Sequence, residues 1–115
     1  MRLADYVIKF LESKEIDTVF TLSGGGSIFL CDALYKAKKL KYIPCHHEQA
    51  VAFATESYSR IKNKPGAAVV TTGPGGTNCT TGVACCWIDS VPAIFISGQV
   101  YLNQTIAKTG TRQVG

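Results

Sequence analysis

Glu48 lies in the segment 46–54, His-His-Glu-Gln-Ala-Val-Ala-Phe-Ala, where an extended stretch turns into an apolar helix. A buried carboxylate without a partner costs on the order of several kcal/mol or takes up a proton. On the predicted helix, Glu48 shares its stripe with Ala52 and Thr55. A carboxyl group in such partly apolar surroundings can keep a proton near neutrality, which suits hydrogen bonding or proton transfer. The first turn of a helix also favours carboxylates through its dipole alone, so spacing leaves a purely structural role open.

A second unusual stretch, Thr-Thr-Gly-Pro-Gly-Gly-Thr-Asn at 71–78, also lies between a predicted strand and a predicted helix. Small residues after a parallel strand let a ligand or another backbone approach closely. Ligands of open α/β sheets bind at the carboxyl ends of strands, where this loop must lie. It is not a P-loop, because no Gly-Lys-Ser/Thr follows, and neither it nor the glycines at 24–26 complete a dinucleotide fingerprint. A tight strand-to-helix turn explains these glycines equally well on spacing alone.

The elements that must position these residues alternate between helical and strand patterns. The sequence predicts helices at 3–13, 27–35, 47–61 and 77–88, and strands at 17–22, 41–45, 67–72 and 91–97. This alternation predicts a doubly wound α/β fold, with a mostly parallel sheet and helices on both faces. The polar residues after the last predicted strand show no helical pattern, so no helix is expected to follow and cover that strand. We therefore expect a fold truncated at its C-terminal end.

Composition narrows the class of protein. The chain has 115 residues, is 46% hydrophobic and carries a net charge of +4, which fits one globular domain with its own core. Its lysine cluster at 36–41 lacks interleaved aromatic residues, so we expect a solvated helix end and no nucleic-acid partner. The sequence contains no signal-peptide pattern and no apolar run of the ~20 residues needed to span a membrane, so we expect no membrane partner. Five cysteines without framework spacing indicate reduced thiols and a cytoplasmic protein.

The run Cys45-His46-His47 contains residue types that bind metals. Consecutive residues in an extended chain point alternately to opposite faces, however, and no second pair of ligands is spaced to complete a tetrahedron. Cys79 and Cys86 share a helix face, but cysteine is often a small buried hydrophobic residue. No third group would orient a Cys–His nucleophile pair. We therefore expect no metal site within this chain.

Taken in order, these segments resemble the N-terminal pyrimidine-binding domain of thiamine diphosphate enzymes of the acetolactate synthase group. The similarity runs through nearly the whole chain, so residues 1–115 would form part of that domain. It rests on the segments at 19–25, 47–50, 64–66, 73–78, 89–92 and 98–100. The chain departs from the group at Ser23, where proline is common, at His46, where arginine is frequent, and at 85–86, where Cys-Cys replaces residues that are often acidic and small.

The resemblance implies a lyase or carboligase (a transferase) that acts on 2-oxo acids with thiamine diphosphate. Glu48 would be its catalytic residue, hydrogen-bonding N1′ of the aminopyrimidine ring and promoting removal of the thiazolium C2 proton. The other cofactor contacts implied are Gly73, Pro74, Asn78 and Gln99. The candidates for the substrate pocket are Ser23, Gly24 and Gly25.

The resemblance also implies partners that the sequence does not contain. Related enzymes bind the diphosphate and Mg²⁺ through a separate domain with a Gly-Asp-Gly…Asn segment, and no Gly-Asp-Gly occurs here. The Mg²⁺ ligands are therefore expected outside this chain segment, with the site between two subunits of a homodimer or homotetramer. Whether FAD is bound stays open. So do two alternatives: a decarboxylase of another 2-oxo acid in the same superfamily, and a non-catalytic fragment or partner subunit that lacks the diphosphate-binding domain.

Overall fold

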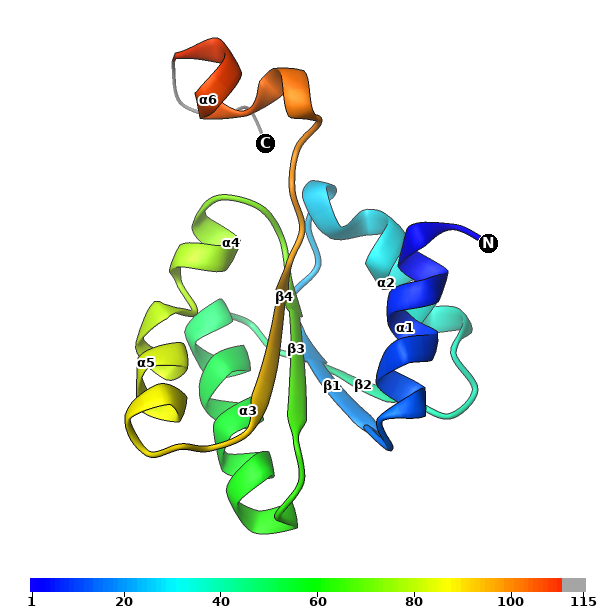
Figure 1. Cartoon of the computed structure of the whole chain (residues 1–115), viewed down its shortest axis with the longest axis vertical. Helices are drawn as coiled ribbons and strands as arrows, with labels where there is room; N and C mark the ends of the chain where they lie inside the picture. The colour runs from blue at the N-terminus through cyan, green and yellow to red at the C-terminus, as the bar shows by residue number, and fades with distance from the viewer. Residues whose placement is uncertain (111–115) are drawn as a thin grey trace.

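The computed structural model of this chain describes residues 1–110 and shows a four-stranded sheet between two layers of helices (Figure 1). All strand pairs are parallel, and the strand order is β2-β1-β3-β4. This confirms the predicted α/β class. The strands are β1 (Thr18–Thr21), β2 (Lys41–Pro44), β3 (Gly66–Val70) and β4 (Ala93–Ser97). The helices are α1 (Leu3–Ser13), α2 (Ile28–Lys36), α3 (Glu48–Lys62), α4 (Pro74–Thr77), α5 (Thr80–Ile88) and α6 (Ile106–Thr109), with 3₁₀ turns η1 (Gly25–Ser27) and η2 (Leu102–Gln104).

Alternating side chains of the central strands build two separate cores, one on each face of the sheet. Val19 and Val69 pack with the buried residues of α1 and α2, whereas Phe20 and Val70 pack with those of α3. Figure 1 shows the same division, with α1 and α2 on one side of the sheet and α3, α4 and α5 on the other. Every residue of β3 is buried, as expected for an apolar strand covered by helices on both faces.

Two predicted features after β3 and β4 are wrong in detail. The helix expected at 77–88 is α5, which begins three residues later at Thr80, and the separate helix α4 precedes it, with a turn at Asn78 and Cys79 between them. Pro74 begins α4 early, because its missing N–H and fixed φ suit the first position of a helix. The chain after β4, expected to lack helix, contains the 3₁₀ turn η2 and the short helix α6, and the final residues 111–115 lie outside the described part.

A glycine sets the distance between α3 and α5. A Cβ atom added at Gly82 would lie 2.4 Å from Cβ of Ala52, far inside a normal contact. The two helices therefore pack backbone against backbone at this point, which fixes the turn at 78–79 close to the start of α3. No helix within residues 1–110 is long and apolar enough to cross a membrane.

Asp17 connects the start of β1 to the end of α3. Its carboxylate accepts hydrogen bonds from Lys64 Nζ and Tyr58 Oη, which lower the pKa of Asp17 below its ordinary value. Because the pKa of Asp17 is lower in the folded state, its ionised carboxylate stabilises the fold at pH values above the ordinary carboxyl pKa of about 4. This contribution is lost as the pH falls through the pKa of Asp17 in the folded state.

We therefore expect Asp17→Asn to lower the melting temperature slightly at neutral pH, because the pair is half exposed and screened by solvent. The difference from the wild type should shrink as the pH falls below about 4. Thermal unfolding followed by circular dichroism at a series of pH values checks this. A difference that is constant over that range would contradict an electrostatic origin.

Candidate functional site

Glu48 is the first residue of α3 and is 9% exposed. The preceding residue, His47, caps the helix, since its Nδ1 accepts a hydrogen bond from the backbone N–H of Gln49 at 3.1 Å. Ala52 and Thr55, on the same stripe of the helix, are completely buried. The predicted burial of this face is therefore confirmed, and the carboxyl group of Glu48 lies at the edge of the core.

The glycine loop at 73–78 reaches the carboxyl group directly. Asn78 Nδ2 donates to Glu48 Oε2 at 3.0 Å. The other oxygen, Oε1, lies 3.8 Å from the position that a Cβ atom at Gly75 would occupy. The Cys79 thiol donates to the backbone oxygens of Glu48, at 3.5 Å, and of Gly75, at 3.6 Å. The structure thus brings the start of α3 and the glycine loop together around one carboxylate.

The glycines of this loop are required by close approach to the strands beside it. Gly73 has φ 58° and ψ −117°, a left-handed backbone conformation that side chains rarely adopt. A Cβ atom at Gly75 would lie 2.7 Å from Thr71 Cγ2, and one at Gly76 would lie 3.0 Å from Ser97 Oγ. Pro74 follows the turn as the exposed first residue of α4. The loop is therefore folded tightly onto the carboxyl ends of β3 and β4.

Thr71 and Thr72 connect three strand ends at this edge of the sheet. The backbone N–H of Gly26 donates to Thr71 Oγ1 at 3.1 Å, and a Cβ atom at Gly24 would lie 2.6 Å from Thr71 Cβ. The Thr72 hydroxyl donates to Gln99 Oε1 at 2.8 Å, and that oxygen also accepts from the backbone N–H of Val100. Gln99 is thereby anchored beside β3. Sequence reasoning missed both threonines, although a Thr-Thr pair between a buried strand and a glycine run was a usable signal.

The substrate-pocket candidates lie in different surroundings, because Gly24 packs against Thr71 beside the glycine loop and Ser23 does not. Ser23 lines a separate hollow of about 290 Å³ with Leu34, Tyr35 and Tyr42, beside α2 and β2. Gly25 lies in η1 with open space around the position of a Cβ atom. The structure places the cofactor candidates Glu48, Gly73, Pro74 and Asn78 on the α3 and α4 side, and it does not bring Ser23 to them.

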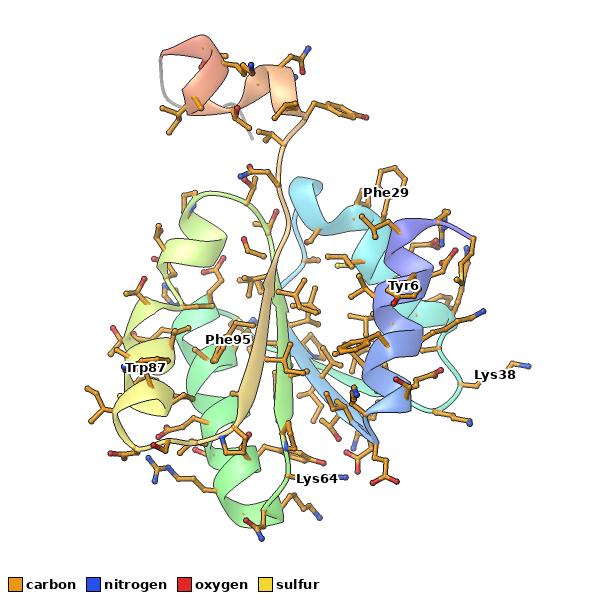
Figure 2. All side chains as sticks on the ribbon, in the orientation of Figure 1. Tyr6, Phe29, Lys38, Lys64, Trp87 and Phe95 are labelled. Carbon is orange, nitrogen blue, oxygen red and sulfur yellow. The ribbon has the colours of Figure 1, made fainter. Side chains whose placement is uncertain are left out.

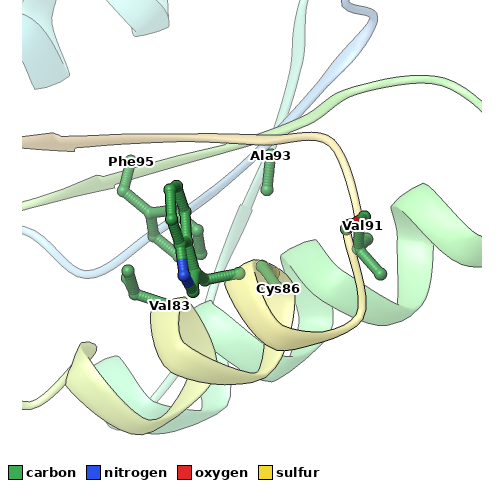
Figure 3. Close-up of a pocket in the computed structure, with 7 residues that line it drawn as sticks. Val83, Cys86, Val91, Ala93 and Phe95 are labelled. Carbon is green, nitrogen blue, oxygen red and sulfur yellow. The ribbon is translucent and has the colours of Figure 1, made fainter.

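Another hollow, of about 360 Å³, lies between α5 and β4 (Figure 3). Phe95 and Val83 line it, as does Trp87, whose side chain is 85% exposed. Figure 2 shows Trp87 and Phe95 on the same side of the sheet. Its lining includes no carboxylate, imidazole, amine or guanidinium, and its one titratable group is the Cys86 thiol.

All five cysteines are free, and Cys79 is the one that contacts Glu48. Burial raises the pKa of the Cys79 thiol, and the nearby charge of Glu48 raises it further. We expect the alkylation of Cys79 by iodoacetamide to have its pH midpoint above that of an ordinary cysteine, because only the thiolate reacts.

Replacing Glu48 with glutamine removes the negative charge and should move this midpoint to lower pH. Mass spectrometry of labelled protein over a pH series provides the measurement. Cys86 is the matched control, because burial and then Glu56 raise its pKa, and Glu48 does not. An unchanged Cys79 midpoint, or an equal shift at Cys86, would contradict the local electrostatic effect.

Comparison with known proteins adds a family relationship to this geometry. Residues 1–113 match the family model described as "Thiamine pyrophosphate enzyme, N-terminal TPP binding domain". The chain is 40% identical over 97 residues to acetolactate synthase, chloroplastic, of Arabidopsis thaliana. The aligned region covers 84% of this chain and 14% of the relative. The chain is also 39% identical over 100 residues to the acetolactate synthase isozyme 2 large subunit of Escherichia coli (strain K12), covering 87% and 18%. A probable acetolactate synthase large subunit of Methanocaldococcus jannaschii is 40% identical over 100 residues, covering 87% and 17%. The chain thus spans less than one fifth of the length of these relatives.

Proposed function

Because the chain belongs to the family of thiamine pyrophosphate enzyme N-terminal TPP binding domains, we propose that it supplies the pyrimidine-binding part of a lyase or carboligase. The substrates would be 2-oxo acids, as in acetolactate synthases. The observation that carries the proposal is the environment of Glu48, a residue 9% exposed whose carboxyl group lies beside the glycine loop at the carboxyl edge of the sheet. Such a position combines limited access to water with a charge that a ligand can approach.

The residues around Glu48 fit an aminopyrimidine ring. A carboxyl oxygen can share a hydrogen bond with a ring nitrogen. Asn78 donates to Oε2 of Glu48, so Oε1 is the oxygen proposed to meet the ring. At Gly75, an added Cβ atom would lie 2.7 Å from Thr71 Cγ2 and 3.8 Å from Glu48 Oε1, so the lack of a side chain lets the loop backbone come close to the carboxyl group.

The diphosphate end of the cofactor does not fit this segment. Within residues 1–110, no group of three or more His, Cys, Asp or Glu side chains could hold a metal ion. Nor does the sequence contain Gly-Asp-Gly. The proposal therefore assigns the Mg²⁺ and diphosphate contacts to residues outside this segment, in a site completed by a second subunit of a homodimer or homotetramer.

Within this site, Glu48 would bind and orient the ring at N1′ and hold or move a proton at that atom. The buried stripe of α3 beneath it limits the access of water, which strengthens such a hydrogen bond. Thiamine diphosphate, when bound, supplies the electron sink for cleaving the bond next to the carbonyl group of a 2-oxo acid. The contribution of this chain is then positioning and proton control, and its Glu48 has no need to touch the substrate.

Product analysis with the full-length protein tests this function. With thiamine diphosphate, Mg²⁺ and pyruvate alone, we expect consumption of pyruvate and formation of acetolactate. Release of carbon dioxide with an aldehyde and no acetolactate would identify a decarboxylase of the same superfamily instead. If pyruvate and other 2-oxo acids are not consumed and calorimetry detects no cofactor binding, the proposal is wrong.

A further inference from the structure

We propose that Asn78 is a positioning residue, whose side-chain amide fixes Glu48 so that Oε1 is the oxygen presented to the ring nitrogen. This inference rests on the proposed function of Glu48 and deepens it. It assigns Asn78 a different role from the direct cofactor contact that the family resemblance implies. The amide Nδ2 lies 3.0 Å from Glu48 Oε2, which is an ordinary hydrogen-bond distance.

The chemistry of this hydrogen bond distinguishes the two carboxyl oxygens. An amide N–H only donates, so it favours an oxygen that carries no proton. A proton on Oε2 would face the amide hydrogens of Asn78 and weaken this hydrogen bond, whereas a proton on Oε1 leaves the hydrogen bond intact. Asn78 therefore selects Oε1, on the side of Gly75, as the oxygen that holds or releases a proton.

Asn78 is itself held in place by its backbone. Its N–H donates to the carbonyl oxygen of Pro74 at 2.8 Å, at the turn between α4 and α5. The next residue, Cys79, donates from its thiol to the backbone oxygen of Glu48. Two consecutive residues thus hold Glu48 by its side chain and by its main chain. Because Asn78 is exposed and Glu48 is buried, a substitution at 78 changes the hydrogen bond without opening the core.

Two variants of the full-length protein test the role, Asn78→Ala, which deletes the donor, and Asn78→Asp, which replaces it with an acceptor of the same shape. Calorimetry measures the affinity for thiamine diphosphate in the presence of Mg²⁺, and proton NMR measures exchange of the cofactor C2 proton at saturation. We expect the affinity of Asn78→Ala to stay within about 3-fold of the wild type, while exchange slows by roughly 10- to 100-fold, as for a misplaced catalytic group. Asn78→Asp should be slower still, because its carboxylate repels that of Glu48.

Asn63 provides the matched control, because it is exposed, lies at the opposite end of α3 and has a left-handed conformation that aspartate tolerates. Asn63→Asp makes the same change of charge and should leave both quantities unchanged. A large loss of affinity in Asn78→Ala with normal exchange at saturation would make Asn78 a cofactor ligand and overturn the inference. Normal values for both would overturn it too. A parallel Glu48→Gln variant separates the failures: if it exchanges at the wild-type rate, the proposed function itself is wrong.

Discussion

Replacing Glu48 with glutamine is expected to slow exchange of the cofactor C2 proton by about 10²- to 10⁴-fold, the usual contribution of a positioned acid or base. Glutamine has the same shape, and its side-chain oxygen can still accept the hydrogen bond from Asn78. It cannot hold or release a proton at the ring nitrogen. The protein should therefore fold normally and lose cofactor activation, which proton NMR of the full-length protein in deuterated buffer measures.

Glu56 is the matched control for this variant, because it lies on the same helix but pairs with Arg60, whose Nε donates to its Oε1 at 3.0 Å. Glu56→Gln removes a carboxylate from α3 without touching the glycine loop, and exchange should stay at the wild-type rate. Equal losses in the two variants would mean that the effect comes from the helix as a whole, and a normal rate in Glu48→Gln would remove Glu48 from the mechanism.

A large effect on stability is expected at Gly82. Its added Cβ atom would meet Cβ of Ala52 at 2.4 Å and the carbonyl carbon of that residue at 3.1 Å, so α5 must move away from α3. Overpacking of this kind costs about 1–3 kcal/mol. We therefore expect Gly82→Ala to lower the free energy of unfolding by about that amount in chemical denaturation.

A second substitution makes this prediction specific. In the double variant Ala52→Gly with Gly82→Ala, the two side chains exchange positions, so part of the loss should be recovered even though glycine within a helix costs about 1 kcal/mol. Gly25→Ala is the control, because nothing lies within 4 Å of its added Cβ atom. Simple addition of the two single losses would show that the helices do not meet at this pair.

The fold was predictable because its elements have strong local patterns. The five residues of β3, Gly-Ala-Ala-Val-Val, form an apolar run bounded by turn residues, and they make a fully buried strand. The last strand begins at Ala93, two residues later than predicted, after Pro92, which has no N–H to donate to a neighbouring strand. The short helix α4 and the later start of α5 were not visible, because apolar periodicity does not show where a turn packs on another element.

The site was predictable in part. The stripe shared by Glu48 and Ala52 indicated burial, and the position of the loop after a parallel strand placed it at the carboxyl edge. The contacts that join these parts span long distances in sequence: 30 residues separate Glu48 from Asn78, and 45 separate Gly26 from Thr71. Such pairs depend on strand order and helix packing, so residue types alone could not reveal them.

The most direct test of the central claim is an experimental structure of the full-length protein with thiamine diphosphate and Mg²⁺. We expect Glu48 Oε1 to lie about 2.6–3.2 Å from N1′ of the aminopyrimidine ring, the range of a functional hydrogen bond. Oε2 should keep its contact with Asn78, and the ring should lie against the loop at 73–78. A cofactor bound with its pyrimidine ring away from this loop, or with the Glu48 carboxyl group turned away from the ring, would contradict the claim.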